Sequence, residues 1–170
     1  MSRPIAILDT NVIILLLDTT NTRAANERRT LCELTIERLE KQGARYIVPA
    51  PVVAELCRTG RGSDTIRSVV RTMISTLRIE VLDEDAADIA GEISRTRLQN
   101  RAGRERGAVK YDALIAGVAQ RIGARWLVTA DADDMRACLA VINSNIEVVV
   151  ADQQAASGQL ALVSVLRPGG

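Results

Sequence analysis

Short apolar runs alternate with longer segments of helical periodicity along the chain. Apolar runs rich in Ile, Val and Leu predict buried strands at residues 3–8, 46–48, 77–82, 126–129 and 146–150. Apolar residues that recur about every 3.6 positions, with charges between them, predict helices. We place these helices at residues 12–17, 24–41, 51–57, 63–75, 86–98, 111–122 and 135–139.

The alternation of strands and helices predicts an α/β fold with a central, mainly parallel sheet. Gly43 and Gly123 each stop a helical segment, and Pro51 suits the first turn of another. With 170 residues the chain fits one domain, which we assign to residues 1–150. Residues 151–170 form a C-terminal extension rather than a separate domain; the extension could be a further strand or helix, or a tail that binds a partner.

The composition removes several classes of chemistry. The chain has no His, which excludes Ser-His-Asp and Cys-His catalysis and zinc sites with His ligands. The net charge is +1, so any nucleic-acid binding must use local basic patches. The aromatic content of 2% argues against base-stacking platforms. Carboxylates, hydroxyls, Lys, Arg or a bound metal must therefore carry any reaction.

The cysteines and the N-terminus indicate the compartment. Cys32, Cys57 and Cys138 lie far apart in apolar helical contexts, which predicts buried free thiols in a reducing cytosol. The N-terminal segment is a poor signal peptide, and the apolar run at residues 12–17 is too short to span a membrane. We therefore expect a cytoplasmic protein that does not associate with a membrane.

Four acidic residues interrupt apolar or small-residue contexts. Asp9 ends the first predicted strand, and Asp131 follows the strand at residues 126–129. Glu55 and Asp112 lie in apolar helical segments. Ligands bind outside the carboxyl ends of the strands in open α/β sheets, so we expect the four carboxylates to meet at that edge.

Each of these acids also has a simpler interpretation when it is taken alone. Asp9 could only cap the next helix, and Asp112 could complement the dipole in the first turn of its helix. Glu55 could lie on a solvated helix face, and Asp131 could be a loop acid. As a set, however, clustered carboxylates cost free energy unless a cation neutralises them. A hard cation such as Mg²⁺ prefers oxygen ligands and is commonly bound together with phosphates, which suggests phosphodiester chemistry.

The acids stand in motifs that resemble a known family. The motifs are Leu8-Asp9-Thr10-Asn11-Val12, Val53-Ala54-Glu55-Leu56, Tyr111-Asp112-Ala113-Leu114-Ile115-Ala116 and Val128-Thr129-Ala130-Asp131-Ala132-Asp133. Their order and spacing over about residues 4–150 resemble the acidic motifs of PIN-domain ribonucleases. Within that family the chain looks most like the VapC-type toxins of toxin–antitoxin systems.

This resemblance implies a three-layer α/β/α sandwich and an endoribonuclease that depends on Mg²⁺ or Mn²⁺ and serves as the toxin of a type II toxin–antitoxin pair. The implied reaction is metal-assisted attack of water on an RNA phosphodiester. The matching positions imply catalytic roles for Asp9, Glu55, Asp112 and Asp131. They imply metal ligands at Asp9, Asp112, Asp131 and Asp133, and supporting polar groups at Thr10, Asn11 and Thr129.

One motif departs from the family pattern. Family members commonly carry Phe after the last pair of acids, whereas Asp134-Met135 stands here. Met135 can fill the same apolar position. The sequence leaves open which of Asp131, Asp133 and Asp134 faces the metal.

Basic residues near the acids are candidates for contacts with RNA phosphates. Arg101, Arg104, Arg106 and Lys110 lie in a predicted Gly-broken loop that leads into Asp112. A solvated charged surface is the alternative interpretation. The resemblance also implies a homodimer and an antitoxin peptide bound in a groove formed by the helices at residues 24–41 and 63–75.

Other functions remain open on the sequence. A PIN-domain nuclease could act in RNA processing, and a catalytically silent chain could use the fold to bind a partner. A phosphatase of the haloacid-dehalogenase type would use Asp9 as its nucleophile. That type expects a second Asp at the position of Asn11, which weighs against it.

Overall fold

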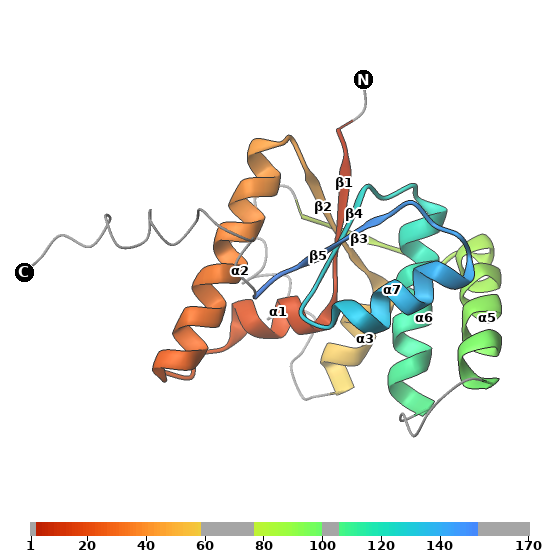
Figure 1. Ribbon diagram of the computed structural model, residues 1–170, viewed down its shortest axis with the longest axis horizontal. Coiled ribbons are helices and arrows are strands. Elements are labelled where there is room, and N and C mark those ends of the chain that lie inside the picture. The colour runs from red at the N-terminus through yellow and green to blue at the C-terminus, as the bar shows by residue number, and fades with distance from the viewer. Residues whose placement is uncertain (1–2, 59–76, 100–105, 153–170) are drawn as a thin grey trace, which may run out of the picture.

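The computed structural model describes residues 3–58, 77–99 and 106–152. Helices and strands alternate through these residues, as the sequence predicts (Figure 1). In chain order they are β1 (Ile5–Leu8), α1 (Thr10–Leu17), α2 (Arg23–Lys41), β2 (Arg45–Pro49), α3 (Ala50–Arg58), β3 (Arg78–Glu80), α5 (Glu84–Gln99), α6 (Arg106–Arg121), β4 (Trp126–Thr129), α7 (Ala132–Val141) and β5 (Glu147–Val150).

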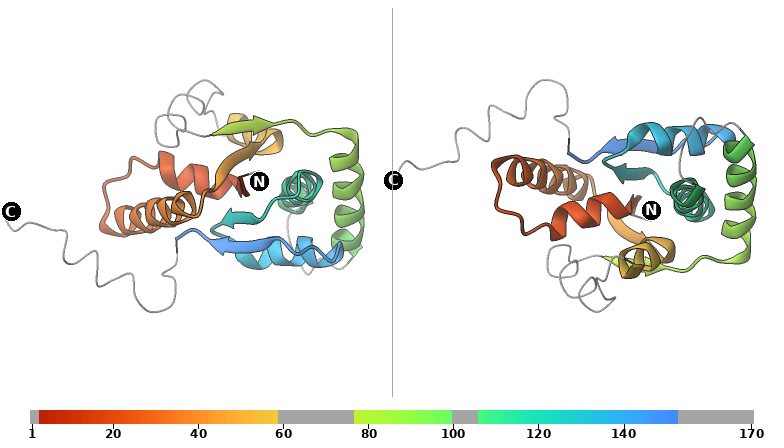
Figure 2. Two further views of the ribbon diagram at one scale, coloured as in Figure 1. Left: turned by 90° about the horizontal axis from the view of Figure 1, so that it is seen from above. Right: turned by 90° about the horizontal axis from the view of Figure 1, so that it is seen from below.

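The strands form one parallel sheet, which confirms the expected fold class. Within the described residues the strand order is β3-β2-β1-β4-β5, and every neighbouring pair is parallel. Figure 2 shows α1 and α2 on one side of this sheet and α5 and α6 on the other. The chain is therefore a three-layer α/β/α sandwich with β1 at its centre.

Burial explains why the central strands read as continuous apolar runs. All four residues of β4 are buried, and Ala6, Ile7 and Leu8 of β1 are fully shielded from solvent. In a parallel sheet that is covered on both faces, both sides of each central strand are buried, so their residues are mostly apolar. The large side chains of Tyr46 and Trp126 fill the same core.

The sheet has its switch point between β1 and β4. The chain leaves β1 into α1 and α2, on one face of the sheet. It leaves β4 into α7, which contacts α5 and α6 on the other face. Two neighbouring strands whose connections diverge in this way leave a crevice at their carboxyl ends, where ligands bind in this class of fold.

The start of α6 differs from the sequence prediction. The helix begins at Arg106 rather than near Tyr111, so Asp112 lies in its second turn and Lys110 lies on the helix instead of in a loop. A Gly inside a helix costs only about 1 kcal/mol, which packing against α5 can offset. The expectation that Asp112 complements the dipole in a first turn is therefore wrong.

Other predictions from the sequence concern cysteines, unplaced segments and membranes. Cys32 and Cys138 are buried free thiols as expected, but Cys57 is exposed near the end of α3, so the expectation for that residue is wrong. The predicted helix at residues 63–75, the side chains of Arg101 and Arg104, and residues 153–170 lie outside the described residues. Within residues 3–58, 77–99 and 106–152, we find no helix with the length and apolar character needed to cross a membrane.

Gly117 permits the close packing of α6 against α5. A Cβ atom at this position would lie 2.5 Å from the backbone oxygen of Ala86 and 3.0 Å from the Cβ of Ala90. We expect Gly117→Ala to lower the free energy of unfolding by about 1–3 kcal/mol, because the two helices must move apart. Urea denaturation followed by circular dichroism measures this change.

Gly91, on α5, is the matched control for this substitution. A Cβ at Gly91 would meet no atom within 4 Å. Gly91→Ala should therefore be neutral or stabilising by up to about 1 kcal/mol, since Ala favours the helix more than Gly does. Equal effects of the two substitutions would show that the packing of α6 against α5 does not depend on Gly117.

Candidate active site

Asp9 leaves the end of β1 and begins α1 as its N-cap residue. Its side chain is 4% exposed and accepts hydrogen bonds from the backbone N–H of Thr10 at 2.6 Å and from the Thr129 hydroxyl at 2.7 Å. Burial raises the pKa of Asp9 to about 6, and the negative charge of Glu55 adds to this rise, whereas the bonds from Thr129 and Thr10 oppose it. Asp9 therefore caps the helix and is also a buried carboxylate with a raised pKa.

Thr129 joins the carboxyl ends of β1 and β4 through its hydroxyl. The Thr129 Oγ1 donates to Asp9 Oδ2 and accepts from the side-chain amide of Asn11 at 3.1 Å and from the backbone N–H of Asp131 at 3.0 Å. The amide oxygen of Asn11 accepts from the backbone N–H of Ala130 at 2.8 Å. Asn11 thus connects the start of α1 to the chain that follows β4.

Glu55 reaches the same region from α3. Its Oε2 accepts a hydrogen bond of 2.6 Å from the hydroxyl of Thr10. Thr10 is buried and belongs to the first turn of α1, so this bond fixes the carboxylate of Glu55 beside Asp9. Hydrogen bonds thus connect Thr10 to Glu55, Thr129 to Asp9, and Asn11 to Thr129 and the backbone of Ala130.

The pKa of Asp112 responds to the charges of the other three acids. Burial, together with the negative charges of Asp9, Asp131 and Glu55, raises the pKa of Asp112 to about 7. The positive charge of Arg97 opposes them. The four acids selected from the sequence therefore share one electrostatic environment, although they come from β1, α3, α6 and the connection from β4 to α7.

Arg97 is a member of this region to which the sequence analysis assigned no role. Its guanidinium donates to Asp134 Oδ1 at 2.7 Å, to the Asp134 carbonyl at 3.0 Å and to the Sγ of Cys138 at 2.9 Å. It also lies 4.0 Å from Asp112 Oδ2, and its side chain is 9% exposed. A signal existed, because Arg97 continues the buried stripe of α5 that is formed by Ala86, Ala90 and Ile93.

The three acids after β4 have different surroundings. Asp131 is the N-cap of α7 and acts on the pKa of Asp112. The carboxylate of Asp134 forms an ion pair with Arg97 at 2.7 Å. The side chain of Asp133 is 90% exposed and lies 3.4 Å from Arg136. The structure thus brings Asp131 to the acids and places Asp133 at the surface of α7.

The basic candidates are only partly described. Lys110 is exposed on α6, two residues before Asp112. Arg106 is the first residue of α6, and its side chain is not among the described ones. Arg101 and Arg104 lie in a segment that the structure does not describe.

The chemistry of the acids fits a divalent cation. All four side chains are carboxylates, which are hard oxygen ligands. Burial, aided by nearby negative charges, raises the pKa of Asp9 to about 6 and that of Asp112 to about 7. In residues 3–58, 77–99 and 106–152, no three acidic or Cys side chains stand together as a ready set of ligands for one ion. The carboxylates are therefore close enough to interact but are not arranged as a closed coordination shell.

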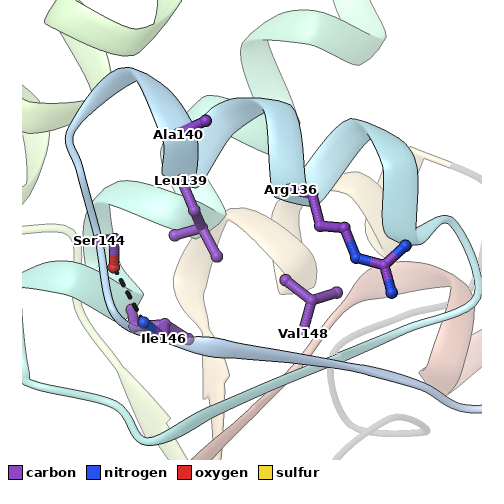
Figure 3. A pocket seen from close by; sticks show the side chains of 6 residues that line it. All are labelled: Arg136, Leu139, Ala140, Ser144, Ile146 and Val148. Atoms are coloured by element: carbon purple, nitrogen blue, oxygen red, sulfur yellow. Dashed lines mark hydrogen bonds between the residues drawn. The ribbon is translucent and has the colours of Figure 1, made fainter.

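A separate cavity of about 300 Å³ lies between α7 and β5 (Figure 3). None of the four acids lines it. Its walls combine the guanidinium of Arg136 with small and apolar side chains: Leu139, Ala140, Ser144, Ile146 and Val148. This cavity is therefore not part of the acidic site.

Thr129→Val tests the hydroxyl that joins the strand ends. Val keeps the shape of Thr but removes the donor to Asp9 Oδ2 and the acceptor for Asn11. We expect the free energy of unfolding to fall by about 1–3 kcal/mol, since buried polar groups lose their partner. Chemical denaturation measures this change, and Thr129→Ser, which keeps the hydroxyl, should stay near wild type. A Val variant as stable as the Ser variant would show that these hydrogen bonds contribute little.

Comparison with known proteins agrees with this architecture. The sequence pattern of the PIN domain family matches residues 6–138. Among solved structures, VapBC2 from Rickettsia felis bound to a promoter DNA fragment is similar at 18% identity and a TM-score of 0.56, covering 87% of this chain and 99% of that chain. VapBC-1 from nontypeable Haemophilus influenzae is similar at 20% identity and a TM-score of 0.57, covering 88% of this chain and 99% of that chain.

A third similar structure is that of a toxin. VapC20 of Mycobacterium tuberculosis, described as a toxin that cleaves the sarcin-ricin loop, is 17% identical with a TM-score of 0.51, covering 78% of this chain and 94% of that chain. No curated protein matches the sequence. The family match spans most of the chain and includes Asp9, Glu55, Asp112 and Asp131. The parallel sheet, the acids at its switch point and this match together place the chain in the PIN domain family.

Proposed function

We propose that this chain is a metal-dependent endoribonuclease that hydrolyses RNA phosphodiester bonds. The observation that carries the proposal is the geometry at the carboxyl ends of β1 and β4, where Thr129 holds Asp9 and Thr10 holds Glu55 by hydrogen bonds of 2.7 Å and 2.6 Å. Burial and the charges of Asp9, Asp131 and Glu55 raise the pKa of Asp112, which agrees with a group of neighbouring carboxylates. Such a group of carboxylates is costly for the fold unless it serves to bind a cation. A cation at the switch point of a parallel sheet is well placed to meet a phosphate.

Asp9, Asp112 and Asp131 are the proposed ligands of Mg²⁺ or Mn²⁺, with Glu55 as the fourth acid of the site. When bound, the ion supplies Lewis-acid chemistry, because it stabilises charge on the phosphate and makes water a better nucleophile. Thr129 keeps Asp9 in position, and Thr10 does the same for Glu55. The chain has no His, and one of these carboxylates is the proposed base that accepts the proton of the attacking water.

A cleavage assay tests this proposal. The full chain is incubated with a mixture of single-stranded RNAs in MgCl₂, in MnCl₂ or in EDTA, and with DNA of the same sequences. We expect RNA fragments only when the metal is present. Asp9→Asn should remove the activity, whereas Asp88→Asn, at an exposed position of α5, should retain it. Absence of cleavage by the wild type under all conditions would refute the ribonuclease proposal.

We further propose that the nuclease is the toxin of a toxin–antitoxin pair. The support comes from the similar structures, which are VapBC complexes and a VapC toxin. The antitoxin would bind on the side of α2, as the sequence analysis expects for the helix at residues 24–41. Inducible expression should stop growth, Asp9→Asn should not, and a small open reading frame next to the gene should relieve the arrest. Cleavage in vitro without growth arrest would favour a role in RNA processing instead.

The oligomeric state remains a proposal from the resemblance. We propose a homodimer that is held together without the antitoxin. Size-exclusion chromatography with light scattering measures the mass directly, and the 18.4 kDa of one chain would double. A single peak at the mass of one chain would refute the dimer without affecting the nuclease proposal.

A further inference from the structure

The chain has a single aromatic ring that a ligand can reach. Of its three aromatic residues, Trp126 is 2% exposed and Tyr46 is fully buried. Tyr111 is partly exposed and directly precedes Asp112. Any stacking of a ligand on an aromatic ring of this chain must therefore use Tyr111, next to an acid of the site.

Tyr111 is paired with a cation from a neighbouring helix. α3 and α6 are in contact and lie side by side (Figure 1). Arg58, the last residue of α3, lies one helical turn after Glu55, and its guanidinium carbon is 5.9 Å from the centre of the Tyr111 ring. Residues three apart on a helix share a face, and Tyr111 directly precedes Asp112, so Arg58 and Tyr111 each neighbour an acid of the site along their own helix.

The charges explain why such a pair is needed beside the acids. A phosphodiester that approaches Asp112 meets negative charge, and Arg58 and Lys110 are exposed cations within a few residues of the acids. A guanidinium can stack on a flat ring and also bind phosphate with two hydrogen bonds. The distance of 5.9 Å is near the outer limit of about 6 Å for a cation–π contact, so a base can compete for the ring at little cost.

We propose that Tyr111 and Arg58 form a base-stacking subsite for unpaired RNA. A nucleobase next to the scissile phosphate packs against the Tyr111 ring, and Arg58 contacts the adjoining phosphate. The subsite selects single-stranded or looped RNA, because a base within a helix is already stacked and is not free to pack against protein. The low aromatic content of the chain therefore does not exclude stacking; it limits stacking to one position.

Binding to RNA with and without bases tests the subsite, which rests on the proposed ribonuclease function. The full chain is titrated in EDTA, so that no cleavage occurs, with a fluorescent single-stranded RNA and with an RNA of the same length that lacks its central bases. We expect the wild type to prefer the complete RNA by about 5- to 150-fold, the range for one stacked base. Tyr111→Ala should remove this preference, and Tyr111→Phe should restore it.

Each outcome decides the proposal. The subsite is refuted if the wild type binds both RNAs equally or binds neither, or if Tyr111→Ala keeps the preference. Should Tyr111→Ala fail to fold, Tyr111→Leu replaces it, since Leu keeps apolar volume without a π face. Cleavage by the wild type in Mn²⁺ separates the two proposals: cleavage without a preference for bases refutes only the subsite, whereas no cleavage refutes the nuclease.

A second Arg on an aromatic ring provides the matched control. The guanidinium carbon of Arg125 lies 4.6 Å from the ring of Trp126, at the amino end of β4 and so at the edge of the sheet opposite the acids. Arg58→Ala should weaken binding of the complete RNA several-fold, and Arg125→Ala should not at the same salt concentration. Equal weakening by the two substitutions would indicate a general loss of positive charge and would refute a specific role for Arg58.

Discussion

Asp112→Asn should reduce RNA cleavage by at least about 100-fold, because it removes a carboxylate from the proposed metal site. The same substitution should stabilise the metal-free fold at pH 8. Burial and the charges of Asp9, Asp131 and Glu55 raise the pKa of Asp112 to about 7 from 3.8, so the ionised carboxylate destabilises the folded state. At 1.36 kcal/mol for each pKa unit, this destabilisation amounts to at most about 4 kcal/mol.

The sign of the pH dependence follows from this raised pKa. Below pH 4 the carboxyl is protonated in both the folded and the unfolded chain, and its stabilising contribution is complete. Between pH 4 and pH 7 the folded chain holds the proton more tightly, so this contribution is lost as the pH rises through the range. Asp9, with a pKa of about 6, should act in the same direction. The wild type in EDTA should therefore be more stable at pH 5 than at pH 8, and Asp112→Asn should flatten this dependence.

Thermal unfolding at both pH values, with EDTA and with Mn²⁺, measures the effect. Mn²⁺ should stabilise the wild type more at pH 8 than at pH 5, because the ion needs ionised ligands. Asp88→Asn, at an exposed position, is the control and should resemble the wild type in every condition. An Asp112→Asn protein that cleaves RNA normally, or that is destabilised at pH 8, would contradict this interpretation of Asp112.

Arg97→Met should lower the free energy of unfolding by about 3 kcal/mol, the lower end of the usual result of removing one partner from a buried ion pair, because this pair is only partly buried. The side chain of Arg97 is 9% exposed, and its guanidinium connects α5 to the start of α7 through Asp134. Without it, Asp134 loses the guanidinium of Arg97, and Asp112 loses the positive charge that opposes its raised pKa. Urea denaturation at pH 7.5 measures the loss.

Two comparisons show whether this loss comes from the ion pair. Arg121→Met removes an Arg that is 43% exposed and contacts Asp83 and Asp85, and it should cost only about 0–1 kcal/mol. Arg97→Met combined with Asp134→Leu should recover most of the loss, since apolar groups can replace a buried pair. An Arg97→Met protein no less stable than Arg121→Met would refute a structural role for the pair.

Two of the acids could be selected from the sequence because each ends or follows an apolar strand, whereas Glu55 and Asp112 stand out as acids within apolar helical segments. Asp9 closes a buried strand, and Asp131 follows another, so the parallel topology fixes their common edge. The parallel α/β fold could be predicted from the alternation of strands and helices, and the PIN family with its three-layer sandwich from the resemblance of the four motifs. The simpler interpretation of Asp9 was also correct, because the residue caps α1 in addition to interacting with the charge of Glu55.

The remaining features depend on contacts between distant segments. The sequence could not show that Asp134 pairs with Arg97, 37 residues earlier in the chain, and so could not assign the acids after β4. Nor could it show that Thr129 joins Asp9 to Asn11, since 118 residues separate Asn11 from Thr129. The start of α6 was missed because Gly107 suggests a loop, whereas the helix includes Gly107 and begins at Arg106.

Crystals soaked in Mn²⁺ and measured at the manganese absorption edge test most directly whether the four acids form one metal site. The anomalous difference map locates the ion without any assumption about activity. We expect a peak at the carboxyl ends of β1 and β4, within coordination distance of Asp9 and Asp112, and no peak in crystals of Asp112→Asn. A map of the wild type without a peak between these two carboxylates would contradict the proposed site.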